Sequence, residues 1–294
     1  MYVDSHQHFW KLSRGDYSWM TPDMKVLYKD FFPEDLEPLI KDKNITQTVI
    51  VQAADTVAET EFTLSLASKH DFIAGVVGWV DLDNDKAKDD IDKLCESNFL
   101  KGFRPMIHDI QDDEWMLKEN LSENLKYMNK KNLTFDALVR PNHLKHLIKF
   151  VNKYDFLPVV IDHIAKPVII NSEIDEWKKD MTELSKANNV HCKFSGIVTE
   201  VGKDYKKNQL DPYIDFILNL FGPDKLMWGS DWPVLTMADS YGNWFDLAMD
   251  YCSSFSEDEK KQNFFIKCKK FLQSLIFIYN FNNEKYFNYR WCGW

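Results

Sequence analysis

The chain alternates between short apolar runs and longer stretches in which apolar residues recur at intervals of three or four. The short runs are typical of buried strands, and the longer stretches are typical of amphipathic helices. We expect strands at residues 1–10, 48–53, 73–80, 100–105, 133–138, 158–163, 190–196 and 226–231. We expect helices from residue 33 and at 58–70, 85–97, 121–131, 143–154, 174–187, 212–221, 244–252 and 257–272. Strands and helices in alternation predict a single (β/α)8 barrel, an α/β fold with its active site at the carboxyl ends of the strands.

Two segments depart from this regularity. Residues 11–32 form a long irregular stretch with several aromatic side chains, which could pack on the barrel rim or close over a ligand. We expect the barrel domain to span residues 1–265, followed by a divergent end at residues 266–294 that is rich in aromatic residues. Because exposed aromatic residues lower solubility, this tail is expected to pack on the barrel or on a second subunit, in a monomer or a homodimer.

Composition excludes several classes of protein. The 294 residues are 45% hydrophobic, enough for a full core, so disorder is not expected. The net charge of −10 and the lack of a dense basic block argue against a nucleic-acid or anionic-membrane surface. No run approaches the roughly 18 apolar residues of a membrane-spanning helix. Five scattered cysteines and a functional-looking strand at the very start predict a cytoplasmic protein with reduced thiols.

Candidate chemistry gathers at the predicted strand ends. His6 and His8 are two residues apart, so in a strand their side chains point to the same face. His163 ends the sixth strand and Asp231 ends the eighth. Imidazoles and a carboxylate suit one divalent metal ion such as zinc, or they could polarise a carbonyl group directly. Asp231 could take a proton from water while the metal or His163 stabilises the oxyanion, which predicts hydrolysis at a carbonyl carbon.

A single histidine at a strand end is more often a hydrogen-bonded rim residue than a ligand, but joint placement at one rim favours a site. Three further residues stand at or just after predicted strand ends, namely Trp79, Arg104 and Arg140. Only four of the 36 basic residues are arginine, and a guanidinium can grip a polar group with two hydrogen bonds where lysine cannot. His108 follows Arg104 by a few residues and remains ambiguous.

Several motifs together resemble those of the amidohydrolase-related sugar-lactone hydrolases, typified by L-fuconolactonases and L-rhamnonolactonases. The motifs include DSHQHFW at 4–10, AGVVGWVD at 74–81, KGFRPM at 101–106, FDALVRP at 135–141, VIDHIAKP at 160–167, KFSGIVTE at 193–200 and MWGSDWPV at 227–234. The resemblance implies a cytoplasmic enzyme of the metal-dependent hydrolase type that opens an aldonolactone ring to the sugar acid. It matches the four predicted site residues to the group's active site and assigns Arg104 to the substrate. The weaker candidates for substrate contact are Trp79, Arg140, Trp232 and His108, the last of which stands where the group commonly has Gln.

The resemblance has limits that bear on mechanism. Strand four ends in Arg104 and strand five offers no histidine, so two metals are not expected. One divalent ion, with zinc as the expected metal, is implied, but relatives that work without metal leave its requirement open. A decarboxylase acting on an unsaturated or aromatic acid is an alternative, disfavoured by the scarcity of arginine. A catalytically silent sugar-binding barrel is disfavoured because the histidines and Asp231 are all present. The sequence does not choose among sugar lactones.

Overall fold

The computed structural model describes residues 2–170, 174–257 and 259. Its centre is one sheet of eight parallel strands in sequential order. The strands are β1 (Tyr2–Gln7), β2 (Ile45–Val51), β3 (Ile73–Gly78), β4 (Leu100–Phe103), β5 (Thr134–Ala137), β6 (Val159–Ile161), β7 (Val190–Phe194) and β8 (Leu226–Trp228). At the carboxyl end, the His8 N–H donates to the Trp232 carbonyl at 2.7 Å and the Asp231 N–H donates to the His6 carbonyl at 2.8 Å. These bonds bring the first and last strands together, and the predicted (β/α)8 barrel is confirmed.

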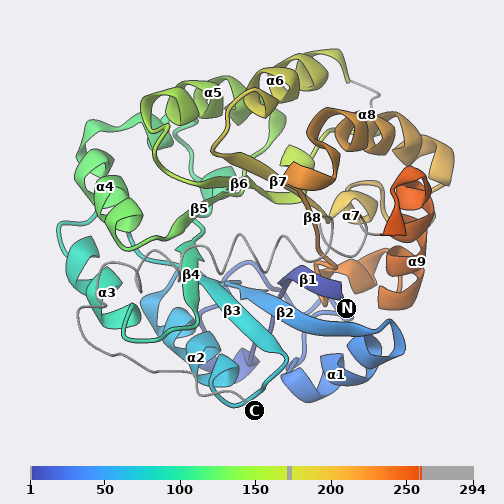
Figure 1. The fold of residues 1–294 in the computed structure, drawn as a ribbon. Helices are drawn as coiled ribbons and strands as arrows, with labels where there is room; N and C mark the ends of the chain where they lie inside the picture. Colours follow the sequence, from blue (N-terminus) through green and yellow to red (C-terminus); the bar gives the residue numbers. More distant parts are fainter. Residues whose placement is uncertain (1, 171–173, 258, 260–294) are drawn as a thin grey trace, which may run out of the picture.

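Helices form a ring around the strands (Figure 1). They are α1 (Pro33–Asp42), α2 (Val57–Ala67), α3 (Ala87–Leu94), α4 (Ser122–Lys130), α5 (Leu144–Lys153), α6 (Asp175–Ser185), α7 (Ile197–Val201), α8 (Lys207–Lys225) and α9 (Tyr241–Tyr251). Helix α1 starts where its sequence favours it, because Pro33 occupies the first turn and the Asp35 side chain accepts the Phe32 N–H at 2.9 Å. Helix α7 was not expected from the sequence, and α8 is longer than the predicted 212–221.

The predicted strands 158–163 and 226–231 extend too far at their carboxyl ends. Strand β6 stops at Ile161, and the four residues from His163 to Lys166 have positive φ angles between 48° and 62°. Strand β8 stops at Trp228, and Asp231 has a φ of 58°. The left-handed conformation interrupts strand pairing, although the apolar Ile164 and Ala165 continue the sequence pattern. The site residues therefore stand on turns just beyond the strands.

The inside of the barrel changes character along its axis. One part is filled by a small apolar cluster of Val3, Val49, Val51, Val77, Val160 and Met227. Alternation along β6 and β7 then places Asp162 on the same inner face as Val160, with Lys193 facing inward beside it. The larger core lies between strands and helices. Apolar side chains thus fill one part of the barrel interior, and the part near the carboxyl ends of the strands contains charged groups.

The irregular segment 11–32 serves both functions considered from the sequence. Tyr17 and Phe31 are buried and pack around Trp10. Trp19 is partly exposed, and its indole N–H donates to the Ala53 carbonyl at 2.7 Å, which places the ring at the carboxyl end of β2. The segment is therefore mainly a layer of core on the rim, with Trp19 as its contribution to the site.

Glu59 of α2 supports this rim and gives a testable pH dependence. Its buried carboxyl group accepts the Ala53 N–H at 3.1 Å, and burial raises its pKa to about 8. A raised carboxyl pKa means that folding favours the protonated form, so stability falls as the pH rises from about 4.5 to about 8. Glu59→Gln keeps the acceptor without the charge, and we expect it to raise Tm above about pH 8 by several degrees, at about 2–4 °C per kcal/mol.

Thermal melts at about pH 5 and pH 8.5 check this expectation. The gain in Tm from Glu59→Gln should be larger at the higher pH. Glu61→Gln is the control, because Glu61 lies on the same helix but pairs with Lys93 at the surface, and its effect should not grow in this way. A Glu59→Gln effect that does not change with pH would contradict the assignment.

Three predictions concern residues outside the part of the chain that the structure describes. The aromatic tail at 266–294 and most of the predicted helix 257–272 lie outside the described residues, and so does the predicted domain boundary after residue 265. Of the helices that are described, none combines the length and the apolar character needed to cross a membrane.

Candidate active site

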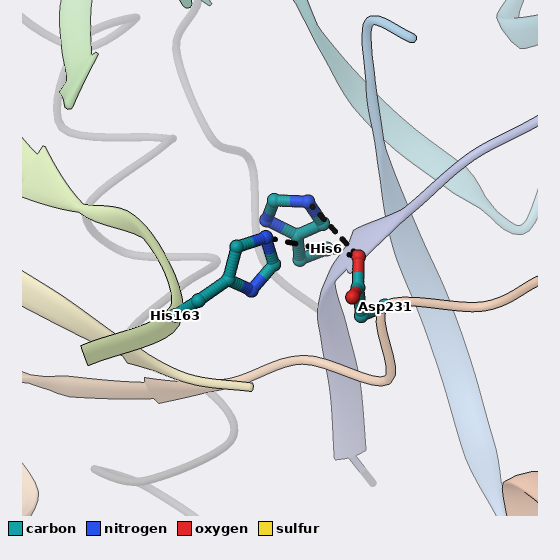
Figure 2. Close-up of side chains that lie close together, drawn as sticks. All are labelled: His6, His163 and Asp231. Atoms are coloured by element: carbon teal, nitrogen blue, oxygen red, sulfur yellow. Dashed lines mark ion pairs between the residues drawn. The ribbon is translucent and has the colours of Figure 1, made fainter. Parts of the chain in front are cut away.

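Four side chains predicted from distant parts of the sequence meet at the carboxyl end of the barrel. Asp231 Oδ1 lies 3.2 Å from His8 Nε2, 3.7 Å from His6 Nε2 and 3.7 Å from His163 Nε2. Figure 2 shows His6 on its strand, His163 on the short turn after β6 and Asp231 on a loop, with their side chains directed toward one another. All four residues are buried. The predicted convergence is therefore present.

Local structure fixes each of these side chains. Strand β1 and the residue that follows it carry His6 and His8. The His163 Nδ1 atom lies 2.9 Å from the Ser195 hydroxyl, which follows β7. The turn that carries Asp231 is fixed through the preceding residue, because the N–H of Ser230 donates to the buried Asp4 carboxylate at 2.9 Å. Strand β1 and the turns that follow β6, β7 and β8 thus set the positions of the four side chains.

Hydrogen bonds also decide which ring nitrogens are free. His8 Nδ1 lies 2.7 Å from the Val51 carbonyl, which can only accept, so Nδ1 carries the proton and a neutral His8 has its lone pair on Nε2. That Nε2 atom lies 3.2 Å from both His6 Nε2 and the Asp231 carboxylate. Lone pairs at this distance repel one another unless a proton or a metal cation lies among them. The lone pairs and the carboxylate of the cluster therefore favour the binding of a cation.

The spacing also fits a divalent metal. Donor atoms of His6, His163 and Asp231 lie within 4.8 Å of one another. Ligands at roughly 2.0–2.2 Å from zinc in a tetrahedral site are roughly 3.3–3.6 Å apart, and the distances to Asp231 Oδ1 are 3.2–3.7 Å. Two or three imidazoles with one carboxylate form the kind of ligand set that binds zinc. The residues present thus fit the predicted metal.

Protonation states in the cluster follow from burial and charge. Burial lowers the pKa of His163 and of His6 well below the ordinary value, with the Lys193 ammonium adding to the effect on His6. Burial alone would raise the pKa of Asp231, but His163 and His8 outweigh it and hold this pKa below its ordinary value. At neutral pH the cluster therefore offers the neutral imidazoles of His6 and His163 beside an ionised carboxylate, which can accept a proton.

A cavity of about 200 Å³ opens onto the cluster. Five of its lining residues are among the predicted site residues, namely His8, Arg104, His108, His163 and Asp231. The others are Trp19, Ala53, Met106, Asp109, Leu138, Lys166 and Val234. Trp19 belongs to the irregular segment, and Lys166 to the left-handed turn after His163. No periodic pattern marks these residues, although the position of Lys166 three residues after a predicted ligand was a usable signal.

Arg104 and His108 both line the cavity. The Arg104 guanidinium is 4% exposed, donates to the Gln52 carbonyl, and has its Nη1 atom 3.4 Å from His6 Nε2. His108 lies 3.0 Å from Asp109, and burial followed by the nearby Lys166 lowers its pKa to about 3. His108 is thus a neutral ring on the cavity wall.

Three predicted contact residues lie away from this cavity lining. Trp232 is 3% exposed and packs edge to face against Phe9 and Phe31 in the core. Trp79 follows β3, where its backbone N–H is bound by Thr60. Arg140 lines a neighbouring cavity of about 400 Å³, which shares Lys166 with the first. None of these three residues is among those that line the cavity beside the cluster.

Comparison with known proteins extends these observations. The amidohydrolase family profile matches residues 3–264. The L-fucono-1,5-lactonase of Burkholderia ambifaria is 40% identical over 256 residues, 86% of this chain and 88% of that protein. The enzyme of the same name from Burkholderia multivorans is 33% identical over 254 residues, 81% and 84% of the two chains.

Among solved structures, a Burkholderia multivorans amidohydrolase crystallised with bound zinc superimposes with a TM-score of 0.84. It is 30% identical, and the superposition covers 92% of this chain and 99% of that one. The profile match includes the strand ends that carry the four clustered side chains, and each of the two sequence relatives spans most of the chain. The chain belongs to the amidohydrolase family.

Proposed function

We propose that the protein is a lactonase that opens the ring of a sugar lactone of the L-fucono-1,5-lactone type and releases the sugar acid. The observation that carries this proposal is the ionised, buried Asp231 at the centre of three imidazoles, beside a cavity of about 200 Å³. Two relatives at 40% and 33% identity carry the name L-fucono-1,5-lactonase, and a more distant one is named L-rhamnono-gamma-lactonase. Both kinds of name agree with hydrolysis of a cyclic sugar ester.

Asp231 is the group that activates water in this proposal. Its carboxylate accepts a proton as the water oxygen attacks the lactone carbonyl carbon, so the nucleophile is generated next to the substrate. When the ring C–O bond breaks, the departing oxygen needs a proton, and the protonated Asp231 can return it. One carboxyl group therefore serves both halves of the reaction.

The imidazoles are the proposed ligands of the metal ion that polarises the lactone carbonyl. His6, His8 and His163 would bind one divalent ion with Asp231, and the ion's chemistry when bound is polarisation of the carbonyl and stabilisation of the oxyanion. The zinc in the B. multivorans structure supports this assignment. The buried Arg104, 3.4 Å from His6 Nε2, is the alternative electrophile, because its guanidinium can donate to the same carbonyl oxygen.

The cavity wall suits a neutral, hydroxyl-rich ring that also has an apolar face. Trp19, Met106, Leu138 and Val234 provide apolar surface. His108, Asp109 and Lys166 provide polar groups that can bind hydroxyls, and Lys166 is held by Glu200 at 2.5 Å. Such mixed walls are typical of small-molecule sites.

Proton release on mixing with a panel of lactones tests the proposal. The panel should contain L-fucono-, L-rhamnono-, L-galactono- and D-arabinono-lactones in both ring sizes, with the spontaneous rate subtracted. We expect hydrolysis well above that rate for at least one deoxysugar lactone. Metal is then extracted with a chelator, and zinc is added back. A full rate of hydrolysis without metal would favour Arg104, and not a metal ion, as the group that polarises the lactone carbonyl. No hydrolysis of any panel member by the zinc-loaded enzyme would contradict the proposal.

Gly196 offers a second test through the placement of His163. It has a φ of 66°, and an added Cβ would lie 2.5 Å from His163 Nδ1. We expect Gly196→Ala to displace the imidazole and lower kcat/KM by roughly 100-fold, the loss that misplacement by about 1 Å can cause. Gly202→Ala is the matched control, because Gly202 also has a positive φ but has no atom within 4 Å of an added Cβ. Both variants lose stability to backbone strain, so equal activity in the two would contradict this role for Gly196.

Location in the cytoplasm and a monomeric or homodimeric state stay predictions. Size-exclusion chromatography with light scattering measures the second directly.

A further inference from the structure

A network of four charged side chains lies inside the barrel next to the imidazole cluster. The Lys193 ammonium is 2.6 Å from Asp136 and 3.0 Å from Asp162 Oδ1. The other oxygen of Asp162 is 3.3 Å from the Arg104 guanidinium. Two positive and two negative charges thus form a neutral set, and each residue is at most 4% exposed.

Stability alone does not account for these charges. Removing ions from water has a large free-energy cost, and well-packed apolar side chains are often at least as stabilising. The adjoining part of the same barrel is filled by Val and Met. Lys193 is also not among the residues that line the cavity, so contact with a substrate does not explain its charge.

The network ends at His6. Asp162 Oδ1 lies 3.5 Å from His6 Nδ1, a buried nitrogen that makes no hydrogen bond within the described part of the chain. On the other side of the ring, Nε2 lies 3.4 Å from Arg104, which can only donate. The proton of a neutral His6 therefore belongs on Nδ1, beside Asp162, with the lone pair on Nε2 toward Asp231.

Asp162 is itself held in place through Lys193. The Thr134 hydroxyl donates to Asp136 at 2.8 Å, and Asp136 binds the Lys193 ammonium, which in turn binds Asp162. A carboxylate that accepts from the second nitrogen of a ligating histidine fixes both the tautomer and the orientation of its ring. Without the ammonium, Asp162 would keep only Arg104 as a cationic partner and could turn toward it.

We propose that Lys193 is a positioning residue: its ammonium holds the Asp162 carboxylate beside His6 Nδ1, and this keeps His6 Nε2 unprotonated and directed into the metal-binding cluster. The link to catalysis rests on the proposed function. The effect on the His6 ring does not require any substrate.

The test compares Lys193→Met with Lys101→Met. Lys101 is the matched control because it is also a strand lysine, is 4% exposed, and donates to a backbone carbonyl, that of Asn98, at 2.7 Å. Both changes remove a buried ammonium and keep a chain of similar length. Only the change at residue 193 should reach His6.

Two readouts are needed. In the metal-free protein labelled with 15N-histidine, with His6 assigned by His6→Gln, the spectrum should show a proton on Nδ1 in the wild type and in Lys101→Met, and mixed tautomers in Lys193→Met. Competition with a chromophoric chelator should show zinc affinity reduced by roughly 10–100-fold in Lys193→Met. Zinc affinity in Lys101→Met should stay within about 2-fold of the wild type.

A second variant serves as a control for misfolding of Lys193→Met. Lys193→Met with Asp136→Asn removes one positive and one negative charge, leaves Asp162 with Arg104, and should show the same loss of zinc affinity. Unchanged His6 tautomer and zinc affinity in the folded Lys193 variants would overturn the proposal. If the wild type hydrolyses no lactone but these shifts occur, the proposed function fails and the positioning role stands.

Discussion

Replacing Asp231 by Asn should reduce the rate of lactone hydrolysis by roughly 10³-fold or more. Loss of a general base typically lowers the rate by about 10²–10⁴-fold. Asn has the shape of Asp but cannot accept a proton from water at neutral pH. It can still accept from the surrounding groups through its amide oxygen, so the fold should be kept. Initial rates on the best substrate of the panel, together with circular dichroism and Tm, check both parts of this expectation.

Asp246→Asn is the control for loss of one negative charge, because Asp246 lies at the surface and pairs with Lys43. It should leave kcat/KM unchanged. Hydrolysis by Asp231→Asn at the wild-type rate would remove Asp231 from the mechanism, and the base would have to be sought elsewhere in the cavity.

His163→Asn is expected to have the second largest effect, a loss of roughly 10²–10³-fold in kcat/KM. The imidazole Nε2 beside Asp231 disappears, and with it one predicted metal ligand and one stabiliser of the oxyanion. Asn is chosen because residue 163 has a φ of 53°, a conformation that Asn adopts more readily than Ala. Its amide can also reach toward Ser195, so the turn should be preserved.

Ser195→Ala provides a graded comparison. It removes the hydroxyl that lies 2.9 Å from His163 Nδ1 but leaves the imidazole in place. Steady-state kinetics should show a smaller loss, roughly 10-fold, because the ring is less firmly oriented. A larger loss in Ser195→Ala than in His163→Asn would contradict the order of roles assigned to these two residues.

The barrel and the core of the site were predictable because they depend on repetition and on strand ends. Eight apolar runs separated by helical stretches allow few arrangements, and parallel strands place their carboxyl ends at one rim. His6, His8, His163 and Asp231 could therefore be expected to meet, although they span most of the sequence. The structure brings them within hydrogen-bonding or ion-pairing distance of Asp231 Oδ1.

The cavity wall was less predictable because irregular backbone supplies it. Trp19 comes from a segment without periodicity, and Lys166 from a left-handed turn that no apolar pattern reveals. Trp232 stands beside a predicted ligand, yet its ring packs against Phe31 in the core. Contacts between segments decide these positions, and a single sequence does not contain them in periodic form.

The buried charges were missed for a related reason. Asp136 and Lys193 lie within strands that read as mostly apolar, and each looks like an exception until the pairing of β5, β6 and β7 places both beside Asp162. That Asp136 and Lys193 form a buried network with Asp162 becomes evident only from the register of the three strands.

The central claim is that Asp231 makes a water molecule attack the lactone carbonyl. A single turnover in water enriched in 18O, with enzyme in excess over L-fucono-1,5-lactone, tests it most directly by mass spectrometry of product and protein. Our account predicts one 18O atom in the carboxylate of the sugar acid and none in the protein. Label that appears in Asp231, or an unlabelled product from the first turnover, would show that the carboxylate attacks the substrate itself and would contradict the account.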